Sequence, residues 1–148
     1  MRIVTKAEYA EAKAEVDQAQ AAIKNDPKAT DRLQMRMQWY NGVVQRFMQQ
    51  KTDPKPTRAV EIHVLRIGDV AVCTNRFELF TDFGICIKAR SKALQTIVIQ
   101  LAGPGTYLPT EKAVRGGHYS AVVESNLVGP KGGYILVDRT VELINSMW

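Results

Sequence analysis

Two polar side chains stand where the sequence predicts strands to end. Glu78 follows a predicted strand over residues 70–74, and Tyr107 closes the loop 103–107 after a predicted strand over residues 94–101. Because α/β proteins bind ligands at the carboxyl ends of parallel strands, both residues are candidates for a functional role. The alternative is purely structural: Glu78 is predicted to open a helix, with Asp82 one turn later, and the helix dipole stabilises such carboxylates without any further role.

The other reactive side chains form no recognised catalytic pattern. His63 alternates within a predicted strand and is expected at the surface, whereas His118 lies in a glycine-flanked loop and is a further candidate ligand. Cys73 and Cys86 both stand among apolar residues and are expected to be buried free thiols. The chain contains no His-Glu-x-x-His or Cys-x-x-Cys spacing, and the glycines of residues 129–133 lack the ending of a phosphate-binding loop.

Residues 1–56 are predicted to form a helical hairpin. Thr5 and Glu8 have the spacing of a capping box, and a break at 25–27 separates two helices, the second over residues 30–50. One apolar face on each helix is marked by Tyr9, Ala12, Val16, Ala19 and Ile23, then by Leu33, Met37, Tyr40, Val44 and Phe47. These faces are expected to pack against each other, with coiled-coil association to another chain as the alternative.

Residues 57–148 are predicted to form an α/β segment. Strands are expected over residues 60–64, 70–74 and 94–101, and helices over residues 77–91, 110–115 and 134–146. The first two strands flank a tight turn at 68–69, and the succession of strand, helix and strand predicts a right-handed parallel crossover. The predicted fold class is therefore α/β: an N-terminal helical hairpin followed by a partial, mainly parallel β-sheet with flanking helices.

The composition excludes several classes of protein. The chain of 148 residues has a formal net charge of +5, spread evenly over the two segments, with no basic block that would indicate nucleic-acid binding. It contains no apolar run long enough for a transmembrane segment and no apolar region of a signal peptide near its N-terminus.

Several motifs of the second segment resemble the C-terminal part of the catalytic domain of neutral/alkaline ceramidase-like hydrolases. They occur in order: Leu-Arg-Ile-Gly-Asp-Val-Ala at 65–71, Phe-Glu-Leu-Phe-Thr-Asp-Phe-Gly at 77–84, Ile-Lys-Ala-Arg-Ser at 87–91, Tyr-Leu-Pro-Thr at 107–110 and Gly-Gly-His-Tyr-Ser at 116–120. The helical hairpin fits the variable insertion that similar bacterial members carry ahead of the first of these motifs.

The resemblance implies a zinc-dependent amide hydrolase. In that family two histidines from an earlier part of the domain, one Glu and one Tyr surround the metal. The matching residues here are Glu78 and Tyr107 as metal ligands, with Tyr107 also a candidate catalytic residue near the oxyanion. Arg76 and Phe77 replace the usual Pro-Gly before the family Glu, and neither His63 nor His118 matches the family histidines.

The missing ligands decide what the resemblance implies for this chain. We expect the C-terminal portion of a ceramidase-like zinc amidohydrolase, inactive in isolation and without tightly bound zinc, whose partner is the missing N-terminal part of the domain. The alternative is a non-catalytic module that binds a ligand or self-associates into a homo-oligomer. The substrate and the localisation stay open, since full-length relatives can be exported and the family name does not establish ceramide.

Overall fold

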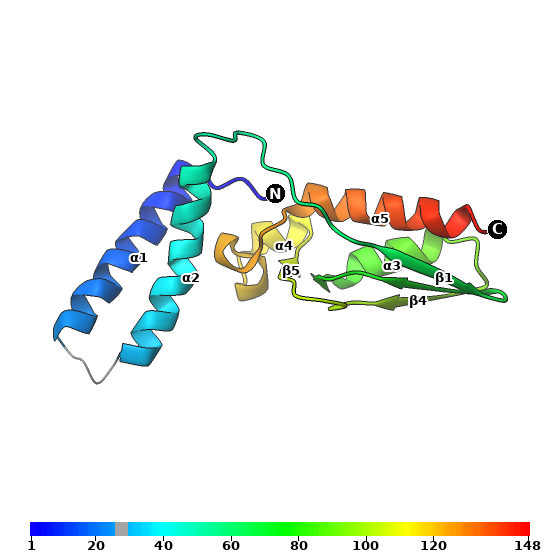
Figure 1. Ribbon diagram of the computed structural model, residues 1–148, viewed down its shortest axis with the longest axis horizontal. Coiled ribbons are helices and arrows are strands. Elements are labelled where there is room, and N and C mark those ends of the chain that lie inside the picture. Colours follow the sequence, from blue (N-terminus) through cyan, green and yellow to red (C-terminus); the bar gives the residue numbers. More distant parts are fainter. Residues whose placement is uncertain (26–29) are drawn as a thin grey trace. The chain divides into compact units, whose positions relative to one another are not determined.

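The computed structural model describes residues 1–25 and 30–148 and has the expected α/β architecture (Figure 1). The chain divides into two compact units, one made of Ile3–Pro56 and the other of Met1–Arg2 together with Thr57–Trp148. No helix among the described residues is long and apolar enough to cross a membrane.

The first unit is a pair of helices, α1 (Lys6–Asn25) and α2 (Thr30–Gln49). The predicted capping box is confirmed at the start of α1: the Thr5 backbone N–H donates to Glu8 Oε2 at 2.7 Å, and the Glu8 N–H donates to Thr5 Oγ1 at 3.2 Å. The predicted helix break falls largely on residues 26–29, which lie outside the described residues.

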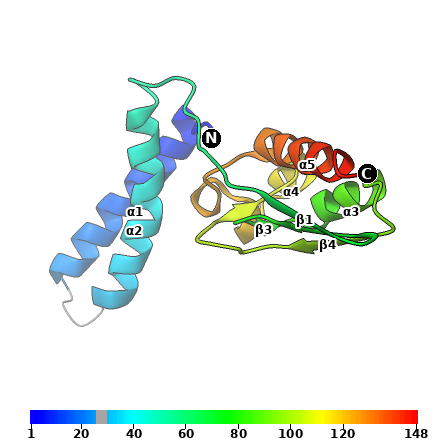
Figure 2. The same cartoon turned by 45° about the vertical axis from the view of Figure 1, so that its right-hand side comes forward.

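The two helices lie side by side along their length (Figure 2). The predicted faces meet between them, because the Tyr9 and Phe47 rings stack with centroids 4.3 Å apart. The buried residues of these helices are Ala12, Val16, Ala19, Val43 and Arg46. Beyond the end of α2, Gln50 accepts a hydrogen bond from the Val4 N–H at 2.7 Å and donates one to the Val4 carbonyl at 3.0 Å, which ties the two ends of the pair together.

The second unit contains two small sheets. The larger has the order β1-β2-β4, with strands β1 (His63–Ile67), β2 (Val70–Thr74) and β4 (Gln95–Ile99). β1 and β2 are antiparallel, while β2 and β4 are parallel and joined through α3 (Thr81–Arg90), so the predicted parallel crossover is confirmed. The smaller sheet pairs β3 (Glu78–Leu79) in parallel with β5 (Tyr107–Leu108). β1 begins at His63, later than predicted, because the backbone of residues 60–62 does not pair with a neighbouring strand.

The remaining helices follow β5. They are α4 (Glu111–Gly116), the short 3₁₀ helices η2 (Tyr119–Ala121) and η3 (Val123–Ser125), and α5 (Pro130–Asn145). The α4 prediction is confirmed, with the Thr110 hydroxyl capping it by accepting from the Ala113 N–H. The predicted start of the last helix is wrong, because Pro130 occupies the first turn of α5, where its missing N–H has no cost.

The core lies between one face of the larger sheet and helices α3 and α5 (Figure 2). Its buried members are Ala71, Cys73, Phe77, Phe83, Ile87, Leu108, Val128, Leu136, Val137, Val141 and Ile144. The helices approach closely at Gly133, where an added Cβ would lie 2.3 Å from Cζ of the Phe83 ring. Only glycine leaves room for that ring.

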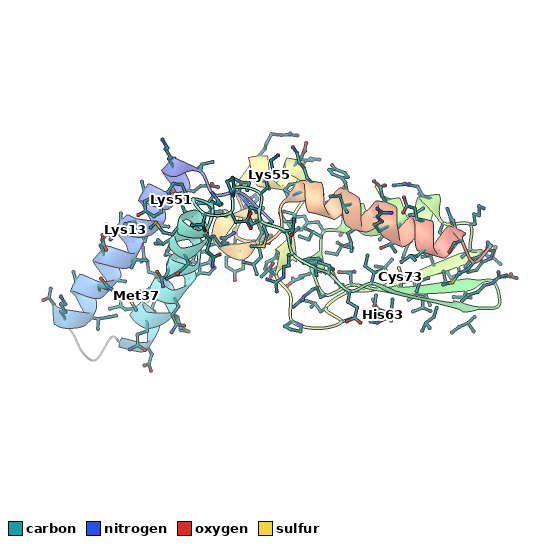
Figure 3. All side chains as sticks on the ribbon, turned by 45° about the horizontal axis from the view of Figure 1, so that its top comes forward. Lys13, Met37, Lys51, Lys55, His63 and Cys73 are labelled. Atoms are coloured by element: carbon teal, nitrogen blue, oxygen red, sulfur yellow. The ribbon has the colours of Figure 1, made fainter. Side chains whose placement is uncertain are left out.

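The cysteine prediction is half right. Cys73 is buried in the sheet, and burial raises the pKa of its thiol. Cys86 is exposed, because α3 turns Phe83 and Ile87 toward the core and leaves Cys86 on its outer side. The strand register places Cys73 and His63, both labelled in Figure 3, on opposite faces of the sheet.

The first two residues belong to the second unit. The Arg2 N–H donates to the Leu127 carbonyl at 2.9 Å, and its guanidinium donates to the Ala121 carbonyl at 2.7 Å and to Oδ1 of Asn126. Asn126 is fully buried. Arg2 therefore fixes the chain on the η2–η3 segment before the helical pair begins.

Candidate functional site

Glu78 and Tyr107 are the first residues of two neighbouring parallel strands. They are direct partners in the β3–β5 register, so their side chains project from the same face. The prediction that Glu78 opens a helix is wrong. Its N–H donates to the Thr106 carbonyl at 3.2 Å, which makes it a strand residue, and α3 begins only at Thr81. Asp82 therefore does not share a helix face with Glu78.

Asn75 directs the chain from the larger sheet toward β3. It is 4% exposed and extends the β2–β4 ladder, since its N–H donates to the Ile99 carbonyl at 2.9 Å. Its side-chain Oδ1 accepts from the Phe77 N–H at 3.0 Å, and its carbonyl accepts from the Ala102 N–H at 2.9 Å. These bonds fix the bend that precedes Glu78.

The loop before Tyr107 packs directly on the backbone before Glu78. At Gly105 an added Cβ would lie only 1.7 Å from the Arg76 carbonyl oxygen, so the two chain segments touch without any side chain between them. The Arg76 Nε donates to the Pro104 carbonyl at 2.6 Å across the same contact. The Gly-Pro-Gly loop thus sets the distance between the two strands that carry the pair.

The phenol and the carboxylate interact. A hydrogen bond to Glu78 is the main cause that raises the pKa of Tyr107; desolvation and the charges of Glu78 and Tyr119 raise it further. The Tyr119 ring meets the Tyr107 ring edge to face, with centroids 6.0 Å apart. Tyr119 was not among the predicted site residues. Its place within the Gly-Gly-His-Tyr-Ser motif was the only signal in the sequence.

Glu78 and Tyr107 alone provide too few ligands for a zinc site. A catalytic zinc takes about three protein ligands. The described residues contain no group of three His, Cys, Asp or Glu side chains that could hold a metal ion. His63 lies apart from the pair on β1, where its Nε2 is 3.1 Å from a Glu61 carboxylate oxygen. The two oxygens of Glu78 and Tyr107 therefore fit part of a zinc ligand set and do not complete one.

His118 and Asp82 line a separate cavity of about 520 Å³ that has both polar and apolar side chains on its wall. Phe80 and Thr110, which follow β3 and β5, line it too, so it lies at the carboxyl ends of this parallel pair. This is the region where α/β sheets bind ligands. The role of His118 as a ligand stays a prediction.

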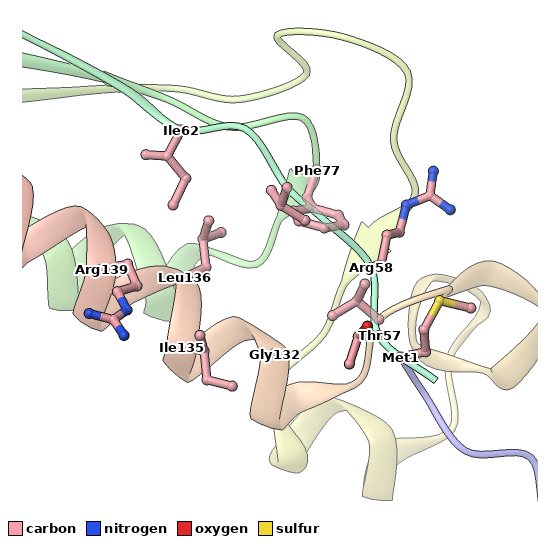
Figure 4. Close-up of a pocket in the computed structure, with 11 residues that line it drawn as sticks. Met1, Thr57, Arg58, Ile62, Phe77, Gly132, Ile135, Leu136 and Arg139 are labelled. Carbon is pink, nitrogen blue, oxygen red and sulfur yellow. The ribbon is translucent and has the colours of Figure 1, made fainter. Parts of the chain in front are cut away.

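A second cavity, of about 330 Å³, is apolar (Figure 4). Ile62, Phe77 and Leu136 line it, with Arg58 and Arg139 also on its wall. Arg139 forms an ion pair with Glu142 at 2.7 Å. The extended residues 57–62 pass over α5 here without strand pairing, which leaves the space open.

Comparisons of the chain with models of protein families, with curated proteins and with solved structures found no match in any of the three.

Proposed function

We propose that the chain is a portion of a ceramidase-like zinc amidohydrolase that supplies Glu78 and Tyr107 to a metal centre completed by other residues. The observation that carries the proposal is the direct pairing of these two residues across parallel strands. The neighbouring Glu78 side chain also raises the pKa of the Tyr107 phenol. Topology and the family resemblance single out the same two residues on separate grounds.

The two side chains suit such a centre chemically. When a complete ligand set holds it, zinc lowers the pKa of bound water and polarises an amide carbonyl. Glu78 supplies an anionic oxygen, and Tyr107 supplies a phenol oxygen beside it. Because Glu78 raises the pKa of Tyr107 and so favours the protonated phenol, ligation by the phenolate would release a proton.

The chain by itself is proposed to be inactive. Two oxygen ligands fall short of the roughly three that a catalytic zinc needs, so no route to a metal-activated water follows from the described residues. We expect a dissociation constant for zinc weaker than about 1 μM, which corresponds to less than about 8 kcal/mol of binding free energy.

Isothermal titration calorimetry with zinc tests the proposal. The purified chain should show no tight site, whereas the chain mixed with the N-terminal half of a ceramidase-like hydrolase should gain one. Glu78→Gln should abolish the gained site, and Glu111→Gln, on exposed α4, should leave it intact. Sub-micromolar zinc binding by the chain alone contradicts the proposal.

The apolar cavity favours a second candidate, a non-catalytic module that binds an apolar ligand. A cavity of about 330 Å³ is at the lower end of the range for small-molecule sites. The test is calorimetric titration with 1-octanol. On this hypothesis the alcohol binds the chain, Ile62→Trp fills the cavity and abolishes binding, and zinc has no influence. Absence of octanol binding removes this candidate.

A further inference from the structure

The larger sheet has one face that nothing in the second unit covers. Residues aligned across neighbouring strands point to the same face, and α3 and α5 lie together on the other side of the sheet (Figure 2). The face away from these helices, called the open face, consists of His63, Leu65, Ile67, Val70, Val72, Thr74, Gln95, Ile97 and Ile99.

The open face is apolar although it is exposed. The exposed fractions are 59% for Leu65, 65% for Ile67, and 45% for each of Ile97 and Ile99. No Lys, Arg, Asp or Glu stands on it. A sheet with one solvated face normally alternates apolar inward and polar outward residues. Here six of the nine residues on the open face are apolar, and its polar residues His63, Thr74 and Gln95 stand at strand ends. An apolar centre on both faces is the pattern of a sheet buried on both sides.

The strand arrangement supports the same reading. β2 and β4 pair in parallel within a mixed sheet, whereas the sheets that commonly leave one face in water are antiparallel. β4 is also an edge strand that contains neither a charged residue nor a proline. Natural proteins protect solvent-exposed edges with such residues. The sheet is therefore built to lie inside a larger assembly.

The size of the open face indicates what covers it. Three strands of five residues span a footprint of roughly 16 by 14 Å, or about 230 Å². A stable interface between separate proteins needs about 800 Å² from each partner. A second copy docked on this face alone would thus be held weakly. The layer that covers the open face must therefore contact more of the protein than this face alone, as one layer of a domain contacts the rest of that domain.

We infer that the open face is the docking surface for a second β-sheet, carried by the part of the hydrolase domain that brings the remaining zinc ligands. The inference rests on the proposed function. Medium-sized and β-branched side chains such as Val72 and Ile97 fill the space of about 10 Å between two stacked sheets. The covered face, by contrast, has the small residues Ala71, Cys73 and Thr96 at its centre, where α3 and α5 approach.

The open face and the candidate site are close along the chain. β2 and β4 end at Thr74 and Ile99, and from these ends the chain runs to Glu78 and to Tyr107. A layer on the open face would therefore lie next to the ends of β2 and β4, and these strand ends lead directly to Glu78 and Tyr107.

The first experiment uses the chain alone with the dye 8-anilinonaphthalene-1-sulfonate. The wild-type chain should enhance dye fluorescence, and Ile97→Lys should lower the enhancement at least twofold. Ile85→Lys, which removes an isoleucine on α3 that is more exposed than Ile97 (59% against 45%), should leave the enhancement unchanged. No enhancement by the wild type overturns the inference, because the face is then already covered. A tight wild-type dimer in sedimentation velocity that Ile97→Lys dissociates also overturns it, because the occupant is then a second copy.

The second experiment co-expresses the chain with the N-terminal half of a ceramidase-like hydrolase. Co-purification should fall at least tenfold with Leu65→Lys, with Ile97→Lys and partly with the milder Ile97→Thr, which keeps a β-branched residue in the strand. Ile85→Lys should have no effect. In the complex, nuclear Overhauser effects from the Ile97 methyl group should reach α-protons of extended partner backbone; contacts to a helix overturn the sheet assignment.

The same complex separates this inference from the proposed function. Glu78→Gln should abolish zinc uptake and leave co-purification intact. Co-purification that depends on the open face but brings no zinc means that the proposed function fails and the docking surface stands. Zinc uptake in a complex indifferent to Leu65→Lys and Ile97→Lys, or no co-purification at all, overturns the docking surface.

Discussion

Replacing Gly105 by alanine should disrupt the contact that places Glu78 beside Tyr107. The new Cβ would lie 1.7 Å from the Arg76 carbonyl oxygen and 2.6 Å from its carbonyl carbon. Carbon and oxygen atoms in contact are normally about 3.3 Å apart. The loop must therefore move by about 1.6 Å. No side-chain rotation can relieve the clash, because both partners are backbone.

The cost has two parts. Overpacking strain of this kind is typically about 1–3 kcal/mol. The movement also threatens three hydrogen bonds, each worth about 1 kcal/mol net: Arg76 Nε to the Pro104 carbonyl at 2.6 Å, the Glu78 N–H to the Thr106 carbonyl at 3.2 Å, and the Leu101 N–H to the Phe77 carbonyl at 3.2 Å. Since relaxation preserves some of these, we expect Gly105→Ala to lower the free energy of unfolding by about 3 kcal/mol.

Urea unfolding followed by tryptophan fluorescence measures this loss. Trp148 packs against the core of the second unit, so a Trp39→Phe background makes it the reporter of that unit. Gly84→Ala is the matched control, because it makes the same chemical change within α3 with nothing within 4 Å of the new Cβ. It should raise stability by about 0.5–1 kcal/mol. A loss below about 0.5 kcal/mol for Gly105→Ala would refute the argument from the backbone contact.

Three further predictions concern the site, the thiols and the first helix. Glu78→Gln should lower the pKa of Tyr107 toward its usual value of about 10, measured as tyrosinate absorbance against a Tyr107→Phe reference. Because the pKa of Tyr107 is raised in the folded protein, its contribution to the free energy of unfolding is complete below about pH 10 and is lost as the pH rises through the raised pKa. Glu78→Gln should remove this loss of stability at high pH. Cys86 should react with a thiol reagent in the native protein, and Cys73 only upon unfolding, because it is buried and burial raises the pKa of its thiol. Thr5→Ala should destabilise the first turn of α1 by about 1 kcal/mol, seen as faster amide hydrogen exchange there.

Each of these predictions has a result that contradicts it. A Tyr107 titration that is the same in Glu78→Gln as in the wild type would show that Glu78 does not raise the pKa of Tyr107. Equal reaction rates of the two native thiols would deny the burial of Cys73. Unchanged exchange in the first turn of α1 would show that the capping box adds no stability.

Local patterns sufficed to predict much of the fold. The capping box at Thr5, the apolar faces of the two helices, the turn at Gly68 and the cap at Thr110 all act over a few residues, so the sequence displays them directly. The parallel crossover followed from the order of the elements. Glu78 and Tyr107 could be proposed as neighbours for the same reason, because both follow strands of that crossover.

Features that depend on distant partners were not predicted. Glu78 lies in a strand because its N–H donates to the Thr106 carbonyl, and the next N–H, of Leu79, donates to the Gln100 side chain at 2.8 Å. Both acceptors are distant in sequence from the helix that the local pattern predicted. Cys86 stands in a stretch that is apolar on several sides, so periodicity alone did not separate its outer face from its inner one. The apolar character of the open face emerged only from the strand register, which assigned each residue to a side.

The way in which the chain enters and leaves the helical pair affects the folding of the second unit. Arg2 must return to Leu127 and Ala121, and a disordered Ile3–Pro56 segment between Arg2 and Thr57 would form a long flexible loop. Once the helices fold, the two hydrogen bonds between Val4 and Gln50 shorten that loop about sixfold, which lowers its closure cost by about 1.6 kcal/mol. The folded helical pair thus lowers the entropy cost of bringing Arg2 to its partners. Destabilising the pair should slow the docking of Arg2, even though the residues that bind Arg2 are unchanged.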